Sequence, residues 1–151
     1  MWNLRDTMLA LMLLVAPLGG SAQHQHEHEE AASGGLVLEH GAKWATDAPL
    51  RDGMERIREL IAVPQATVTA GIVLSPADAR QLADGVRHHV DELIQNCKLE
   101  PDADAALHVL IADMLKGAAE LAEGSQSAMG LARIQNAIDQ YPKYFSHPGW
   151  E

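Results

Sequence analysis

The spacing of apolar residues along the chain predicts four helices. In four stretches, apolar side chains recur every three or four residues, which places them on one face of a helix. The expected helices cover residues 48–62, 76–97, 102–122 and 126–140. Because the links between them are short, we expect an all-α, up-down-up-down four-helix bundle.

Proline residues and capping side chains set the expected boundaries of these helices. Asp47 is expected to cap the first helix, Ser75 the second and Asp102 the third, with Pro101 ending the second helix. Pro64 should end or kink the first helix, although its apolar stripe can be extended to about residue 70. The aromatic-rich residues 141–150 are expected to pack across the bundle end instead of continuing the last helix.

The first 22 residues have the pattern of a secretory signal peptide. Arg5 is followed by an apolar run over residues 8–16 and by small residues that end at Ala22. The run is too short to span a bilayer, and no cysteine lies nearby to carry a lipid anchor. We therefore expect a periplasmic protein cleaved after Ala22, with no membrane anchor.

A polar, histidine-rich segment follows over residues 23–35, before the bundle domain of residues 36–151. It cannot bury apolar surface and is expected to be a disordered tail. His24, His26 and His28 share one side of an extended chain, and imidazole is the commonest side-chain ligand for copper, zinc and nickel. The tail is therefore a candidate metal collector, with a simple solvated linker as the alternative.

The charge and composition restrict the classes of partner and fold. The formal net charge is −10, which disfavours binding to nucleic acid and to anionic lipid. The chain has one Phe and two Tyr, and this scarcity favours helices over a β-sandwich.

The sharpest chemical feature is the only cysteine, Cys97, which cannot form an internal disulfide. The up-down topology places it at the same bundle end as Met54 and His108. A thiolate and a thioether favour Cu(I), whereas Mg or Ca would require oxygen ligands. His40 and His147 lie in segments that flank this end. The alternatives are a buried inert Cys97, a core Met54 and a hydrogen-bonded boundary His108.

Two segments resemble a family of small exported bacterial proteins sometimes labelled DnrO-like. They are Gly41-Ala-Lys-Trp44-Ala-Thr-Asp47-Ala-Pro-Leu50-Arg-Asp-Gly53-Met54-Glu-Arg-Ile57-Arg and Asn96-Cys97-Lys98-Leu99-Glu-Pro101-Asp-Ala103-Asp104-Ala-Ala-Leu107-His108, about a fifth of the chain. The resemblance implies a periplasmic helical bundle and no particular activity.

The sequence thus predicts a periplasmic metal-binding protein, with Cu(I) as the favoured ion, that buffers copper, confers tolerance or delivers it to an unidentified partner. No nucleophile elbow, His-Glu-x-x-His or phosphate-loop motif is present, so we do not expect an enzyme. One alternative is a haem b electron carrier with Met54 as ligand. The other is a structural or regulatory module without metal.

On the second helix, His88 is expected to be solvated and His89 to lie at the edge of the apolar stripe.

Overall fold

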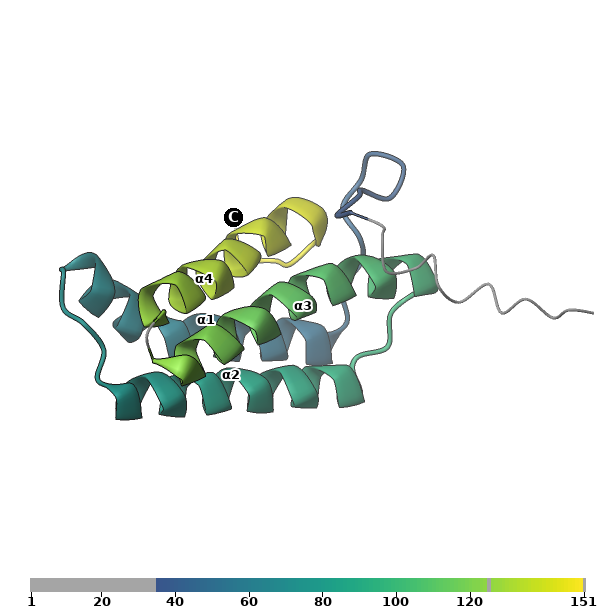
Figure 1. The fold of residues 1–151 in the computed structure, drawn as a ribbon. Coiled ribbons are helices and arrows are strands. Elements are labelled where there is room, and N and C mark those ends of the chain that lie inside the picture. The colour runs from purple at the N-terminus through teal and green to yellow at the C-terminus, as the bar shows by residue number, and fades with distance from the viewer. Residues whose placement is uncertain (1–34, 125, 151) are drawn as a thin grey trace, which may run out of the picture.

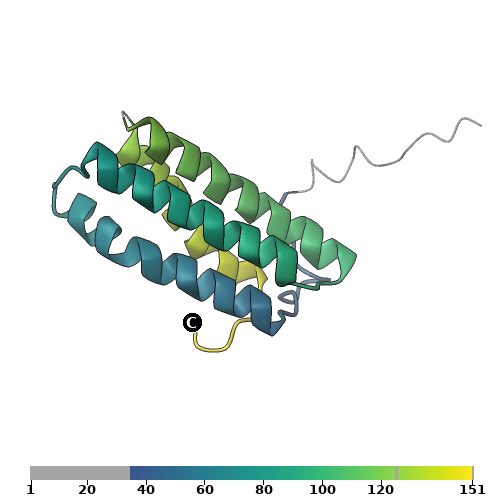
Figure 2. The ribbon, with the colours of Figure 1, turned by 90° about the horizontal axis from the view of Figure 1, so that it is seen from below.

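A computed structural model describes residues 35–124 and 126–150, which form four helices around one core (Figure 1). The helices are α1 (Ala48–Thr69), α2 (Pro76–Asn96), α3 (Pro101–Glu123) and α4 (Ser127–Tyr144). Each helix packs against two others, in the cyclic order α1, α2, α3, α4, and Figure 2 shows the same arrangement from below. The predicted all-helical bundle is confirmed. The expected signal peptide and most of the His-rich tail lie outside the described residues.

The first two helices begin where their capping residues predict. The Asp47 carboxylate accepts a hydrogen bond from the Leu50 N–H at 2.9 Å, and the Ser75 hydroxyl accepts one from the Asp78 N–H at 3.1 Å. The prediction for α3 was wrong by two residues, because Glu100 and not Asp102 is its N-cap residue. Pro101 is the first residue of α3, a position where its missing N–H costs nothing.

Pro64 lies inside α1 and does not end it, so the extended form of the first helix is the correct one. Ile61 before the proline is buried, and Val68 after it packs against the same core. Apolar contacts on both sides of Pro64 therefore offset the backbone hydrogen bond that proline cannot donate.

The last helix also runs further than predicted, through Pro142 to Tyr144. Tyr141 is completely buried, and this packing extends the helix by four residues. The chain then turns back as expected. The backbone N–H of Trp44 donates to the Tyr144 carbonyl at 2.7 Å, and the backbone N–H of Ser146 donates to the Trp44 carbonyl at 2.9 Å. These bonds connect the lead-in segment to the end of α4.

The predicted apolar stripes form the core, with one exception in α4. Leu82, Val86, Val90 and Leu93 of α2 are all buried, as their spacing predicts. Met129 was expected to face inward, but 59% of its surface is exposed. Its neighbours Gly130 and Leu131 are buried instead, because a close backbone contact with α3 sets the rotation of α4.

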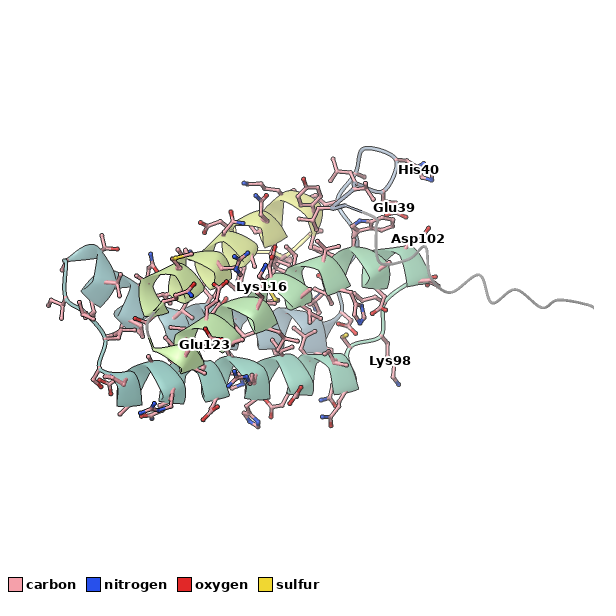
Figure 3. All side chains as sticks on the ribbon, viewed as in Figure 1. Glu39, His40, Lys98, Asp102, Lys116 and Glu123 are labelled. Carbon is pink, nitrogen blue, oxygen red and sulfur yellow. The ribbon has the colours of Figure 1, made fainter. Side chains whose placement is uncertain are left out.

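The lead-in segment forms a tight hairpin at one end of the bundle. Glu39 and Ala42 exchange two backbone hydrogen bonds of 2.9 and 2.8 Å, and the two residues between them have positive φ angles of 49° and 90°. These angles identify a two-residue type I′ turn. Figure 3 shows His40 and Glu39 on this hairpin, at the bundle end where Asp102 and Lys98 also lie.

Within the described ranges, none of the helices is both long enough and apolar enough to cross a membrane.

Candidate metal centre

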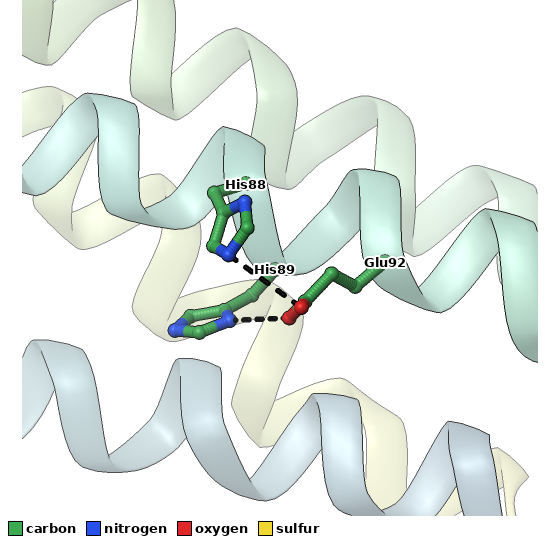
Figure 4. A group of neighbouring side chains, drawn as sticks. All are labelled: His88, His89 and Glu92. Atoms are coloured by element: carbon green, nitrogen blue, oxygen red, sulfur yellow. Dashed lines mark hydrogen bonds and ion pairs between the residues drawn. The ribbon is translucent and has the colours of Figure 1, made fainter.

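His88, His89 and Glu92 of α2 bring three potential ligand atoms within 4.8 Å of one another. No other group of three His, Cys, Asp or Glu side chains meets this criterion in residues 35–124 and 126–150. Figure 4 shows both imidazoles beside the carboxylate, with a contact from each ring to Glu92. The geometry follows from helix periodicity, because residues three and four positions apart lie on the same surface of a helix.

The two histidines contact different oxygen atoms of Glu92. His88 Nε2 lies 3.5 Å from Oε1, and His89 Nδ1 lies 3.1 Å from Oε2. Side-chain exposure is 66% for His88, 22% for His89 and 41% for Glu92. The donors are therefore held on a helix anchored by the buried Val86 and Val90, yet an ion can reach them from solvent.

The electrostatic surroundings keep the Glu92 carboxylate ionised. The hydrogen bond with His89 is the main cause that lowers the pKa of Glu92, and the nearby His88 and Arg56 lower it further. Partial desolvation acts in the opposite direction without overcoming these contacts. The carboxylate can thus accept either a guanidinium or a metal ion.

Two imidazoles and one carboxylate suit Cu(II), Zn(II) or Ni(II). Ligands about 2.0–2.1 Å from a tetrahedral metal are roughly 3.3 Å apart, whereas the three ligand atoms here lie within 4.8 Å of one another. Side-chain rotations would bring them closer together around a shared ion. Three protein ligands would leave at least one coordination position open to water or another ligand.

The Cys97 region was the candidate site predicted from sequence. Cys97 is the C-cap residue of α2 and is partly buried. Burial raises the pKa of its thiol, and the carboxylates of Asp47 and Asp104 raise it further. His108 is exposed, with Nδ1 2.8 Å from the Asp104 carbonyl and 3.3 Å from an oxygen of its carboxylate. Asp104 is therefore a common neighbour of the two predicted ligands.

The other predicted ligands are dispersed. Met54 is completely buried in the core. His40 is at the tip of the amino-terminal hairpin, whereas His147 stacks on Trp150 with ring centroids 4.8 Å apart. In the described part of the chain, none of the groups of three ligand atoms contains Cys97, His108, His40 or His147. The tail residues His24, His26 and His28 lie outside the described residues.

Sequence reasoning missed the group that the structure does assemble. His88 is exposed, as predicted, but its ring is directed to Glu92. The signal was present in the spacing, because His88 and His89 precede Glu92 by four and three residues. This spacing alone predicts that both rings can reach one carboxylate.

Comparisons with known proteins identify no family for this chain. No protein-family model matches the sequence, and no match is found among the curated proteins or the solved structures. The resemblance of residues 41–58 and 96–108 to the DnrO-like proteins stays a prediction.

Proposed function

We propose that this chain is an exported periplasmic metal-binding protein that holds one divalent transition-metal ion at His88, His89 and Glu92. Copper is the proposed ion, and buffering, tolerance or delivery of copper is the proposed role. The observation that carries this proposal is the convergence of three ligand atoms on the exposed face of α2.

The choice of Cu(II) follows from the ligand types. Nitrogen and oxygen ligands bind divalent metals with affinities that rise to copper and fall again at zinc. The net charge of −10 attracts cations of any kind and adds no selectivity. In the proposal, His24, His26 and His28 form a second, weaker collecting segment.

A Cu(I) site at Cys97 is the second candidate, and the geometry of His108 favours it. A carbonyl oxygen can only accept a hydrogen bond, so Nδ1 of His108 donates to Asp104. In the neutral imidazole, Nε2 is then the nitrogen without a proton, which can bind a metal. Met54 would contribute a thioether to this site only if the core around it opened. Haem b at Met54 would require still more repacking of the core.

A Cu(II) competition titration tests the proposed function. The full mature chain is used with His24, His26 and His28 replaced by Ala, so that the tail cannot mask the bundle site. Replacing both His88 and His89 by Ala should weaken Cu(II) binding at least about tenfold, which is about 1.4 kcal/mol.

Asn136→Ala is the control, since it removes an exposed polar side chain from α4, outside the group. This variant should bind Cu(II) like its parent. Unchanged affinity in the His88→Ala, His89→Ala double variant would overturn the proposed function.

A further inference from the structure

We propose that Arg56 is a built-in competitor for the metal at Glu92, and that it changes carboxylate partner when the metal binds. This inference rests on the proposed metal site. In the metal-free chain Arg56 pairs with Glu92, and in the metal-bound chain it pairs with Asp52 instead.

The first observation is that Arg56 and the metal would share one carboxylate oxygen. Arg56 reaches across from α1 and places a guanidinium nitrogen 3.4 Å from Oε2 of Glu92. His89 contacts the same oxygen at 3.1 Å. A metal bound between His89 and Glu92 would therefore come close to the guanidinium, and the two positive charges would repel each other.

The second observation is that Arg56 has both space to move and a second partner. Arg56 and Glu92 line a groove of about 270 Å³ between α1 and α2, and Asp52 and Asn96 line it as well. Asp52 precedes Arg56 by four residues on α1, which is the spacing of a helical ion pair. Among the described residues, Asp52 has no ion-pair partner within 4.0 Å.

These observations define two alternative ion pairs for one arginine. Without metal, the Arg56–Glu92 pair links α1 to α2. With metal, Glu92 becomes a ligand and its charge is no longer available to Arg56, so the guanidinium moves to Asp52 within the same helix. The cost of breaking the first pair lowers the metal affinity, and the gain from the second partly offsets that cost.

A double-mutant cycle measured by Cu(II) competition tests this exchange. The background is again the full mature chain without tail histidines. Arg56→Gln should tighten Cu(II) binding about two- to fivefold, the range expected when an exposed charge competes for one carboxylate. Asp52→Asn should weaken Cu(II) binding in the presence of Arg56 and should have no effect in the Arg56→Gln variant.

Arg58→Gln is the matched control, because it removes the same charge from α1 but pairs with Glu55 and not with Glu92. It should change Cu(II) affinity less than twofold. The inference is overturned if Arg56→Gln matches the wild type or Arg58→Gln, or if Asp52→Asn has the same effect with and without Arg56.

The His88→Ala, His89→Ala double variant, measured in parallel, separates this inference from the proposed function. If the double variant binds Cu(II) weakly but Arg56→Gln changes nothing, the metal site stands and the role of Arg56 is wrong. If the double variant binds Cu(II) like its parent, both proposals fail.

Discussion

Gly117 of α3 and Gly130 of α4 lie backbone against backbone where the two helices meet. A Cβ atom on Gly130 would lie 2.5 Å from the Gly117 carbonyl oxygen and 2.8 Å from the Leu121 nitrogen. A Cβ atom on Gly117 would lie 2.6 Å from the Gly130 carbonyl oxygen. Both positions therefore require glycine, and the contact determines which face of α4 is turned to α3.

Gly130→Ala is expected to destabilise the protein by about 1–3 kcal/mol, the usual cost of overpacking. The clash is with backbone atoms, which cannot move aside without separating α3 from α4. The free energy of unfolding is measured by urea denaturation.

Gly85→Ala is the matched control for Gly130→Ala. Its new Cβ would meet only a terminal methyl group of Leu60, at 2.9 Å, and a flexible side chain can move away. Alanine is also the better helix former by about 1 kcal/mol. Gly85→Ala should leave stability unchanged or raise it, and an equal loss in both variants would contradict the backbone clash.

The carboxyl-terminal segment closes over α1 through an aromatic cluster. Tyr141, His147 and Trp150 pack with ring centroids 4.8–5.7 Å apart. The indole N–H of Trp150 donates to Glu55 at 2.5 Å, and the Arg58 guanidinium lies 4.4 Å from the ring centroid. His147 Nδ1 is buried in this cluster and has no hydrogen-bond partner among the described residues.

We expect this cluster to lose stability below neutral pH. Burial is the main cause that lowers the pKa of His147 from its usual 6.5, with Arg51 and Arg58 acting in the same direction and Glu55 and Asp52 opposing. The fold therefore favours neutral His147. The contribution of neutral His147 to the free energy of unfolding is fully present above about pH 6.5, and it is lost as the pH falls through the lower folded-state pKa.

Thermal unfolding of wild type and His147→Phe between pH 7.5 and 4.5 checks this prediction. The variant keeps an aromatic ring but cannot take up a proton, so its Tm should fall less on acidification. The exposed His108→Ala serves as control and should follow the wild type. A His147→Phe profile parallel to the wild type would exclude His147 as the group responsible.

The Cys97 thiol is expected to react slowly with alkylating reagents at neutral pH. Burial and the carboxylates of Asp47 and Asp104 raise the thiol pKa above its usual 9.0, and only the thiolate is nucleophilic. The rate of iodoacetamide labelling should therefore rise with a midpoint above pH 9. Asp104→Asn removes one of the negative charges and should shift that midpoint downward, whereas Asp139→Asn, which removes a carboxylate that does not act on the thiol, should not.

The sequence predicted the fold well where burial depends on helix period alone. The α2 stripe from Leu82 to Leu93 is an example, because each apolar side chain faces the core. The prediction was wrong for Met129. A hydrophobicity scale rates side chains, so it cannot indicate that a glycine faces the neighbouring helix. In α4 the closest contact is made by the backbone of Gly130, and this contact turns Met129 outward.

The candidate site shows the same division between local and long-range information. His88, His89 and Glu92 lie within five residues on one helix, so their convergence could have been predicted from spacing. Arg56 belongs to α1, and its position over Glu92 depends on the rotation and axial offset of two packed helices. The same dependence applies to Cys97 and His108, which share a bundle end without forming a compact three-ligand group with another His, Asp or Glu of the described chain.

Cu(I) binding decides whether Cys97 and His108 form the second metal site. If the proposal is correct, Cys97→Ala and His108→Ala each lower Cu(I) affinity at least about tenfold, or about 1.4 kcal/mol. A chromophoric chelator under reducing conditions reports the affinity. Because Cu(I) prefers thiolate, the loss should be larger for Cys97→Ala than for His108→Ala. If both variants hold Cu(I) as tightly as the wild type, the ion binds elsewhere.

Met54→Leu extends this test to the core. The substitution nearly preserves volume and should cost less than about 1.5 kcal/mol of stability, so a change in Cu(I) affinity would not reflect unfolding. Weaker Cu(I) binding would mean that the core opens enough for the Met54 thioether to act as a ligand. Unchanged binding would mean that Met54 only packs in the core, in agreement with its complete burial. Cys97 and His108 would then be the only protein ligands of the proposed Cu(I) site.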